Sequence, residues 1–315
     1  IDIDGDLRPI GNDTIVDIGA DEYELDPIDA GVTSLVSPTG ALCTGSMNFT
    51  AEVLNYGIDT IYTMEVVMEV NGVMDTVQFG GALGSGNKAN VSLGAYTFNP
   101  GTRYDIKIFT QRPNGVSDTI NYNDTLRLNG MVLGLSGTYT IDASLPASGT
   151  NYQNFTDAVR DLNRSGVCGP VVFNVAPGMY YESIILGEIL GSSATNTITF
   201  DGADSSMTVI ESQGTAVATI VFDGASNIKI KNLGVRHTGE ENAAILFGPE
   251  ANHNEILNSS LWVKGRSSSY SMPLSFSGNT SSTTITGATA SYNLVKNNRL
   301  ANGYYGIRMY GASAD

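Results

Sequence analysis

The sequence predicts an all-β protein, in which a sandwich of antiparallel strands precedes a stack of parallel strands. The first observation is a series of about seven short strand candidates within residues 32–128, separated by turn-forming residues. The second is a motif that recurs five times in the second half of the chain, at spacings that grow from copy to copy. The third is composition: 15% of residues are charged and 36 are glycine, which suits a chain rich in strands and turns.

The charge of the chain excludes some classes of partner. A net charge of −16 over 315 residues would repel nucleic acid and anionic membranes, so we expect neither nucleic-acid binding nor membrane insertion. No apolar run is long enough to span a bilayer, and no signal peptide is present. The chain begins at Ile1 without Met and stops just after a repeat motif, so we interpret it as an internal piece of a longer protein.

The first residues form an acidic segment punctuated by glycine, IDIDGDLRPIGNDTIVDIGADEY. It resembles the closing coil that ends β-helix domains of bacterial surface proteins. We therefore assign residues 1–26 to the closing coil of a preceding β-helix and a linker. Asp2, Asp4 and Asp6 alternate as carboxylates do in calcium loops, which makes them candidate calcium ligands. Leu7 replaces the glycine that an EF-hand loop requires, so coil-closing turns are the alternative.

Residues 27–131 are predicted to form an immunoglobulin-like β-sandwich, because about seven short strands fall within about 100 residues. Asn71-Gly72 is a hairpin signal between two of them. The segments around Cys43-Thr44-Gly45 and Asn123–Leu126 resemble Ig-like modules of large secreted proteins from the Bacteroidota. The expected strands are Thr33–Ser37, Met47–Leu54, Thr60–Val70, Val73–Phe79, Asn90–Phe98, Tyr104–Thr110 and Asp118–Leu128.

The two cysteines, Cys43 and Cys168, fall in different predicted domains. Two cysteines make no disulfide framework and match no metal-binding spacing. We expect two free, buried thiols. The alternative is a bridge that fixes the domain junction, which an oxidising compartment would permit.

One helix is predicted at the start of the second half. Phe155, Ala158, Val159 and Leu162 lie at helical spacing, and Gly166 ends the segment. We expect this helix to cover the open end of the first coil, because an uncovered strand edge invites aggregation. The strand Val171–Val175 should follow it.

The repeat motif alternates apolar and spacer residues before a turn, as in a short strand with one buried face. Its copies are Ile198–Asp204, Ile220–Ser226, Ile245–Ala251, Leu274–Thr280 and Ile307–Ser313. A second ladder lies between them, in Ile228–Leu233, Ile256–Leu261 and Leu294–Leu300. Residues Gly137–Asp315 thus resemble the right-handed, pectin-lyase-like parallel β-helix family, and we assign 132–315 to the N-terminal part of such a domain. We expect the large residues of the copies to stack inside it: Phe200, Phe222, Phe247, Phe276 and Met309.

Many members of that family cleave polysaccharides with carboxylates on neighbouring coils, so the acids of this chain are of interest. Asp201 and Asp223 occupy the same place in adjacent copies, but the other copies carry no acid there. Asp before Gly is also a common turn pair, so we predict no catalytic residue. His237 with Lys231 and Arg236 could transfer protons, although solvated side chains between coils are the simpler interpretation. Repeated Asn232, Asn258 and Asn297 are expected to be structural.

Five copies of Asp-Thr followed by an aliphatic residue resemble the O-glycosylation signal of periplasmic and secreted Bacteroidota proteins. The alternative is that Asp-Thr marks the passage from a turn into a strand. The candidate threonines are Thr14, Thr60, Thr76, Thr119 and Thr125.

Together these features favour a non-catalytic structural or adhesive segment of a giant secreted cell-surface protein, such as an adhesin, stalk or filament. The resemblance implies type IX secretion and an extracellular, cell-surface location. Partners would be neighbouring repeats of the same chain, surface polysaccharide or other cells, and no cofactor is expected. The alternatives are a polysaccharide lyase or hydrolase with an Ig-like accessory domain, and a carbohydrate-binding module.

Overall fold

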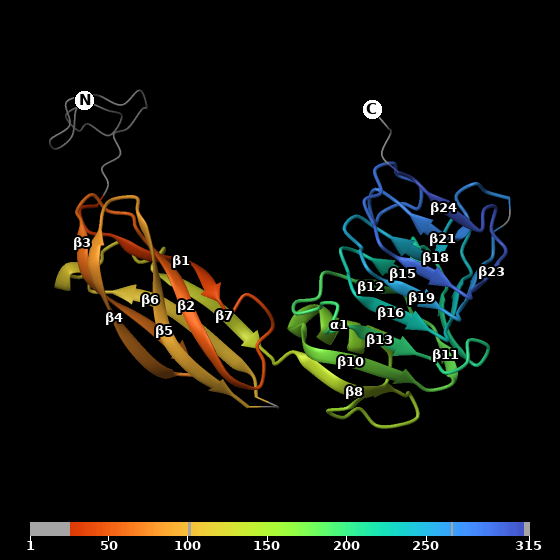
Figure 1. Cartoon of the computed structure of the whole chain (residues 1–315), viewed down its shortest axis with the longest axis horizontal. Coiled ribbons are helices and arrows are strands. Elements are labelled where there is room, and N and C mark those ends of the chain that lie inside the picture. The colour runs from red at the N-terminus through yellow and green to blue at the C-terminus, as the bar shows by residue number, and fades with distance from the viewer. Residues whose placement is uncertain (1–25, 100–101, 266, 312–315) are drawn as a thin grey trace. The chain divides into compact units, whose positions relative to one another are not determined.

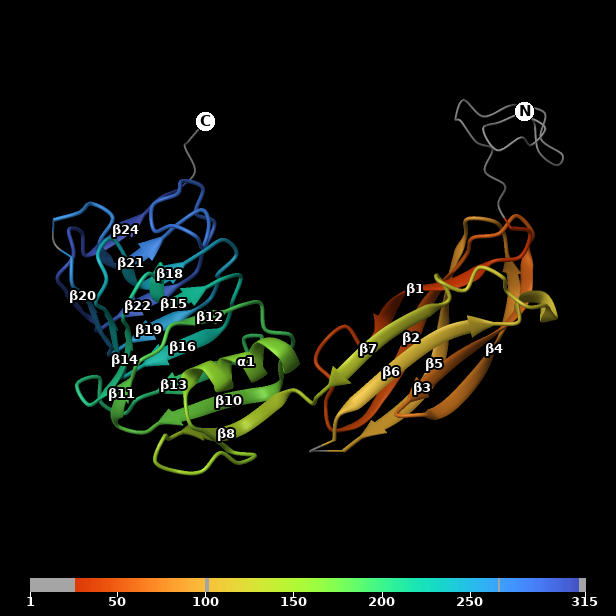
Figure 2. The same ribbon diagram turned by 180° about the vertical axis from the view of Figure 1, so that it is seen from behind.

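The computed structural model describes residues 26–99, 102–265 and 267–311, and these form two compact units. The first unit contains 45–99, 103–131 and the described residues before 40, and the second contains 40–44 and the residues from 132 onward. The regular elements of the described chain are β-strands, apart from one α-helix and one short 3₁₀ helix (Figures 1 and 2). None of its helices is long and apolar enough to cross a membrane. The predicted closing coil falls within residues 1–25, outside the described residues.

The first unit consists of two antiparallel sheets. One has the order β1-β2-β5 and the other β4-β3-β6-β7 (Figure 1). Alternate residues of β2 and β6 face inward, and Phe49, Val66 and Ile106 are among the almost completely buried side chains. The strands are β1 (Ala30–Ser37), β2 (Gly45–Asn55), β3 (Ile61–Val70), β4 (Val73–Leu83), β5 (Lys88–Phe98), β6 (Tyr104–Gln111) and β7 (Thr125–Met131). Seven strands were expected and seven lie in this unit's described residues.

The predicted hairpin is confirmed. Asn71 and Gly72 both have positive φ, 49° and 84°, which are the angles that the tight turn between β3 and β4 requires. The Asn71 side chain also holds the neighbouring strand, because it bonds the main chain of Arg103 and Asp105.

The last strand of this unit is shorter than expected. The predicted strand Asp118–Leu128 was wrong in its first part, since residues 118–124 form a loop and β7 begins at Thr125. The cause is local: the Asp118 carboxylate accepts the main-chain N–H of Ile120, and this turn competes with a strand. Asp118 and Asp124 therefore lie at the two ends of one loop.

The expectation of two free thiols was wrong. Cys43 and Cys168 form a disulfide that closes a separation of 125 residues. The short segment 40–44 leaves the first unit after β1 and belongs to the second, where the Leu42 carbonyl accepts the Gly134 N–H. Gly134 is required at this approach, because a side chain there would lie 2.8 Å from the Ala41 Cβ and 2.9 Å from the Cys168 Sγ. Sequence spacing could not reveal that Cys43 lies in the second unit.

The predicted helix is confirmed as α1 (Phe155–Ser165), ending at Gly166 with φ 69°. The four residues that predicted it are all buried. Its first turn is capped twice: the Asn154 side chain accepts the Asp157 N–H, and the Glu182 carboxylate accepts the N–H groups of Phe155 and Thr156. The helix packs on the first strands of the second unit (Figure 1).

The second unit contains three parallel sheets, and each turn of the chain contributes one strand to each sheet. The sequence predicted at least two strands per turn, and it did not identify the middle sheet as a separate ladder. The first sheet holds β8 (Leu135–Ile141), β9 (Asn151–Tyr152), β10 (Val167–Val175), β13 (Ile198–Asp201), β16 (Ile228–Lys231), β19 (Glu255–Leu257) and β22 (Leu294–Lys296). The second holds β11 (Gly178–Tyr180), β14 (Thr208–Ser212), β17 (Gly234–His237), β20 (Ser260–Val263) and β23 (Arg299–Ala301). The third holds β12 (Ile184–Leu186), β15 (Ala218–Phe222), β18 (Ala243–Phe247), β21 (Met272–Phe276) and β24 (Ile307–Met309).

The expected stack of large residues is correct for three members and wrong for two. Phe222, Phe247 and Phe276 stack at 4.5 and 4.7 Å between ring centroids. Phe200 belongs to the first sheet instead, where its ring stacks on that of Phe173 at 4.8 Å. Met309 is in register with Phe276 but 65% exposed, because β24 is the last described strand of its sheet.

The recurring asparagines mark the tight corner between the first and second sheets. Asn232, Asn258 and Asn297 have φ of 53°, 51° and 58°, a left-handed conformation that asparagine tolerates better than most residues. The Asn232 N–H donates to the Leu257 carbonyl of the next turn, and the Asn258 N–H donates to that of Lys296. These residues are therefore structural, as predicted.

The Phe row allows a matched test of packing. Replacing Phe247 with Ala should lower the free energy of unfolding of the second unit by about 3–5 kcal/mol, because the ring is completely buried between two others. Met309→Ala, at the exposed end of the same row, should change it by about 0.5 kcal/mol or less. Urea unfolding of both variants measures the difference, and equal losses would contradict this register.

Candidate functional site: a cluster of three aspartates

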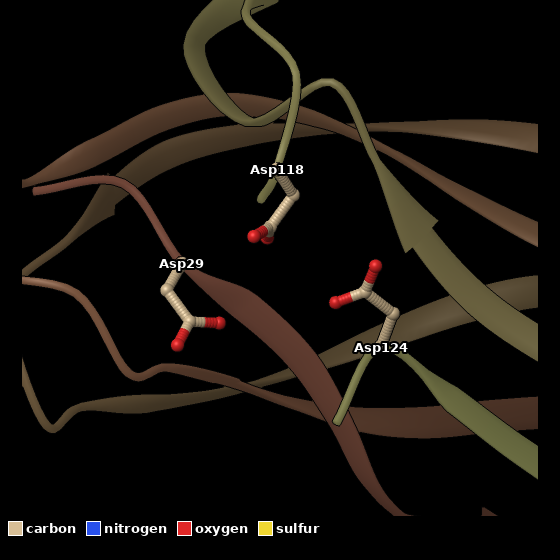
Figure 3. A group of neighbouring side chains, drawn as sticks. All are labelled: Asp29, Asp118 and Asp124. Atoms are coloured by element: carbon tan, nitrogen blue, oxygen red, sulfur yellow. The ribbon is translucent and has the colours of Figure 1, made fainter. Parts of the chain in front are cut away.

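Three aspartates of the first unit point toward one another (Figure 3). Asp29 directly precedes β1, Asp118 lies in the loop after the short 3₁₀ turn Pro113–Gly115, and Asp124 directly precedes β7. One carboxylate oxygen from each lies within 4.8 Å of the others. Because β1 and β7 belong to different sheets, the cluster lies where the edges of the two sheets meet.

Gly31 makes this approach feasible. A side chain at position 31 would lie 2.5 Å from the Asn123 carbonyl oxygen, so only glycine lets the loop reach the start of β1. The main chain is then fixed on both sides of the cluster. The Asp29 carbonyl accepts the N–H groups of Tyr56 and Gly57, and the Asp124 carbonyl accepts that of Thr110.

Two of the three carboxylates have hydrogen-bond donors. The Asp118 carboxylate accepts the main-chain N–H groups of Ala30, at 2.8 Å, and Ile120, at 3.0 Å. The Asp29 carboxylate accepts the side-chain amide of Asn123 at 2.9 Å. Burial raises the pKa of Asp29, and the Asn123 hydrogen bond only partly opposes this.

The third carboxylate has no hydrogen-bond donor among the residues that the structure describes. Asp124 is 9% exposed, and its Oδ1 is buried without a hydrogen-bond partner. The side-chain oxygen of Asn123 is likewise buried and unpaired. Burial raises the pKa of Asp124 to about 7, and the negative charges of Asp118 and Asp29 act in the same direction. A hollow of about 290 Å³ adjoins Asp118 and Asp124.

The second unit carries a separate surface groove of about 520 Å³. Glu240, Glu241 and Tyr270 line it together with small polar residues. Glu240 lies 3.5 Å from the Lys264 ammonium, and Glu241 accepts the Ser268 hydroxyl at 2.9 Å. Two acids and a tyrosine in a groove are the kind of groups that contact a sugar.

His237 is not a solvated side chain. It is completely buried, the Gly239 N–H donates to its Nδ1, and its Nε2 therefore carries the proton that reaches the Ala216 carbonyl at 2.8 Å. Burial lowers its pKa below the ordinary value, so it is neutral at pH 7. The hypothesis that His237 is part of a solvated basic group is therefore wrong. Lys231, another proposed member of that group, pairs with Asp201 at 2.8 Å.

Asp201 and Asp223 do not form a row. Asp201 ends β13 in the first sheet, whereas Asp223 follows β15 in the third. Burial raises the pKa of Asp201, but hydrogen bonds from Lys231, the Ala203 N–H and Asn232 outweigh it and lower the pKa below the ordinary value. Asp201 is thus a paired turn residue.

The glycosylation candidates differ in exposure, and their modification stays a prediction. Thr76 on β4 is exposed, and Thr119 is exposed with its hydroxyl donating to Asp26. Thr60 and Thr125 are half-buried. Thr14 lies outside the described residues.

The acidic cluster was missed in the sequence, which pointed to Asp2, Asp4 and Asp6 instead. Those three lie outside the described residues. Asp118 and Asp124 were noticed as members of Asp-Thr motifs and of the last predicted strand of the sandwich, but not as possible ligands. Asp29 is far from them in sequence, so no local spacing joins the three.

No protein-family model matches the chain, and no curated protein matches it. Among solved structures, it is similar to a domain described as part of a cell surface protein from Methanosarcina acetivorans, at 24% identity over 34% of this chain and 92% of that one, with a TM-score of 0.30. It is also similar to the CARDB domain of a Pyrococcus furiosus protein in complex with di-metal ions, at 16% identity over 35% and 93% of the two chains, TM-score 0.28. The catalytic domain of Agl-KA is similar at 14% identity over 91% and 72%, TM-score 0.20. At these scores none of the likenesses carries an argument about this chain.

The buried His237 makes the stability of the second unit depend on pH. Since its pKa is lowered by folding, the unfolded chain takes up a proton near pH 6.5 that the folded unit resists. The contribution of neutral His237 to the free energy of unfolding is therefore fully present well above pH 6.5. It should be lost progressively as the pH drops below that value. Calorimetry between pH 7.5 and 5 should show a falling melting temperature for this unit.

The control variants come from the two histidines of the chain. His237→Gln should weaken this pH dependence, whereas His253→Gln, at an exposed site, should leave it unchanged. An unaltered slope in His237→Gln would show that another group is responsible.

Proposed function

We propose that this chain is a non-catalytic, load-bearing segment of a secreted cell-surface protein. The observation that carries the proposal is the disulfide between Cys43 and Cys168, which closes a separation of 125 residues. Structural disulfides persist in oxidising compartments, which favours secretion.

The disulfide changes the path of a pulling force. If the chain is held ahead of Cys43 and beyond Cys168, tension crosses the sulfur–sulfur bond and bypasses the residues between them. Strands β2 to β9 and α1 lie within that bypassed loop, and β1 lies ahead of it. Most of the first unit and the start of the second are thus shielded from load, while β1 and the turns of the second unit after Cys168 carry it.

The second unit has the arrangement that load bearing favours. We infer that it is a right-handed parallel β-helix and that the first unit is an immunoglobulin-like sandwich. In support, each turn of the second unit adds one strand to each of three parallel sheets, so adjacent turns share three ladders of main-chain hydrogen bonds. Such ladders must break together when the turns are separated.

The remaining elements of the proposal rest on sequence resemblance. They are type IX secretion, O-glycosylation at Asp-Thr motifs, and partners that include neighbouring repeats of the same chain, surface polysaccharide or other cells. A carbohydrate-binding or carbohydrate-cleaving role is the second candidate. It is favoured by one observation, the groove lined by Glu240, Glu241 and Tyr270.

Single-molecule stretching tests the load-bearing role. With the disulfide intact, the residues between the cysteines should contribute no length when the chain is unfolded by force. The double variant Cys43→Ser/Cys168→Ser should extend by about 40–45 nm more, which is the length of 125 extended residues. Reductant should produce the same gain in the natural chain. Equal final lengths with and without reductant would contradict the bypass.

A polysaccharide assay tests the enzymatic alternative. Incubation with pectin, alginate and chondroitin should release no unsaturated or reducing ends. If products appear, their loss in Glu240→Gln/Glu241→Gln but not in Asp223→Asn would place the chemistry in the groove and overturn the non-catalytic proposal.

A further inference from the structure

We propose that Asp29, Asp118, Asp124 and the side-chain oxygen of Asn123 bind one divalent cation of the calcium type. This inference concerns the first unit alone and does not depend on the load-bearing role. It concerns other residues than Asp2, Asp4 and Asp6, the candidate calcium ligands of the sequence.

The spacing of the carboxylates suits a single ion. Calcium–oxygen distances are about 2.3–2.6 Å, so two ligands on opposite sides of one ion are about 4.8 Å apart. One oxygen from each of the three aspartates lies within 4.8 Å of the others, so one ion can contact all three. The side chains in Figure 3 point toward a common centre.

Two buried oxygens at the cluster need a positive partner. The Asp124 Oδ1 and the Asn123 Oδ1 are both buried without a hydrogen-bond donor. Leaving a buried acceptor unsatisfied is costly, and more so for a carboxylate that is 9% exposed. Asp124 belongs to the cluster and lines the adjoining hollow, and the Asn123 side-chain amide contacts the Asp29 carboxylate. A bound cation would satisfy both oxygens.

Within the described residues, no protein cation balances the charge of the cluster. No lysine or arginine of the described chain forms an ion pair with the three aspartates. Arg112, which lines the adjoining hollow, lies 3.4 Å from Glu65. Three carboxylates with no compensating cation repel one another, which a divalent ion would reverse.

Calcium fits these ligands better than magnesium. Calcium accepts six to eight oxygens in irregular arrangements, whereas magnesium demands a near-ideal octahedron and sheds water reluctantly. The four protein oxygens come from a strand start, a loop and a second strand start, which have no common symmetry. The hollow of about 290 Å³ beside Asp118 and Asp124 gives room for the waters that complete the shell.

The ion would connect the two sheets of the first unit. Asp29 leads into β1 of one sheet and Asp124 into β7 of the other. Two hydrogen bonds hold β1 near this point. The Ala30 N–H donates to the Asp118 carboxylate, and the Thr110 hydroxyl of β6 donates to the Ala30 carbonyl. A cation bound by both Asp29 and Asp124 would link the two sheets. It should therefore make the detachment of β1 from the first unit less favourable.

Calcium binding to the full chain is the direct test. Equilibrium dialysis against ⁴⁵Ca²⁺ at pH 7.5 in 0.15 M NaCl should give one site with a dissociation constant of roughly 0.1–1 mM, the range of extracellular modules. Asp124→Asn should weaken this site at least tenfold. Two matched controls, Asp75→Asn on the exposed face of β4 and Asp2→Asn/Asp4→Asn/Asp6→Asn, should bind as the natural chain does. Unchanged binding in Asp124→Asn, or loss in the triple variant alone, would overturn the proposal.

A melting experiment separates binding from misfolding. Without calcium, Asp124→Asn should melt at or above the temperature of the natural first unit, because it removes an unpaired buried charge. In 10 mM calcium, the folded-to-unfolded ratio of the natural unit should rise about 10- to 100-fold. That of Asp124→Asn should not change. A rise of equal size in the variant, or an equal effect of 10 mM magnesium on the natural chain, would refute the assignment.

Discussion

Burial of inward apolar side chains between successive turns is the interaction on which the second unit depends. No turn of this chain can cover its own inner surface, so each row of side chains is completed only by the turns on either side. Phe247, between Phe222 and Phe276, shows the complete arrangement. At the start of the stack α1 takes the place of a neighbouring turn, and its residue Phe155 packs on both Tyr180 and Phe200. The same constraint explains why the polar corners between strands can differ in length from turn to turn. Their residues are not part of the inward rows and need only connect one strand to the next.

Local pattern was enough to predict the elements that local chemistry determines. Helical spacing and a glycine stop gave α1 within a residue, and Asn71-Gly72 gave the first hairpin. Repeated asparagines at corners were recognised as structural because asparagine side chains commonly form hydrogen bonds with the main chain at turns. The seven strands of the first unit were located, and the largest error in their bounds lies where the Asp118 side chain turns the main chain back on itself.

Features that depend on which segments become neighbours were not predictable. Phe200 was placed in the wrong row because strands of the first and third sheets share one alternation of apolar residues, and only loop length distinguishes them. His237 was expected in solvent, yet the chain closes over it through Gly239 and Ala216. The aspartate cluster joins residues from the two ends of the first unit, and the position that allows it, Gly31, carries no functional signal in the sequence. The sequence showed which residues are acids, but not which of these acids lie together in the folded chain.

The disulfide also determines where this chain can be divided. The apparent boundary near residue 131 suggests that the first unit could be produced by itself, but such a fragment would keep Cys43 and lose Cys168. Its unpaired thiol would sit in a segment whose packing partners, including Gly134, had been removed. Fragments of this kind are prone to couple through intermolecular disulfides. The disulfide also constrains the order of events during biosynthesis. The Cys43 thiol must stay reduced and accessible until β10, which carries Cys168, has been synthesised and has folded.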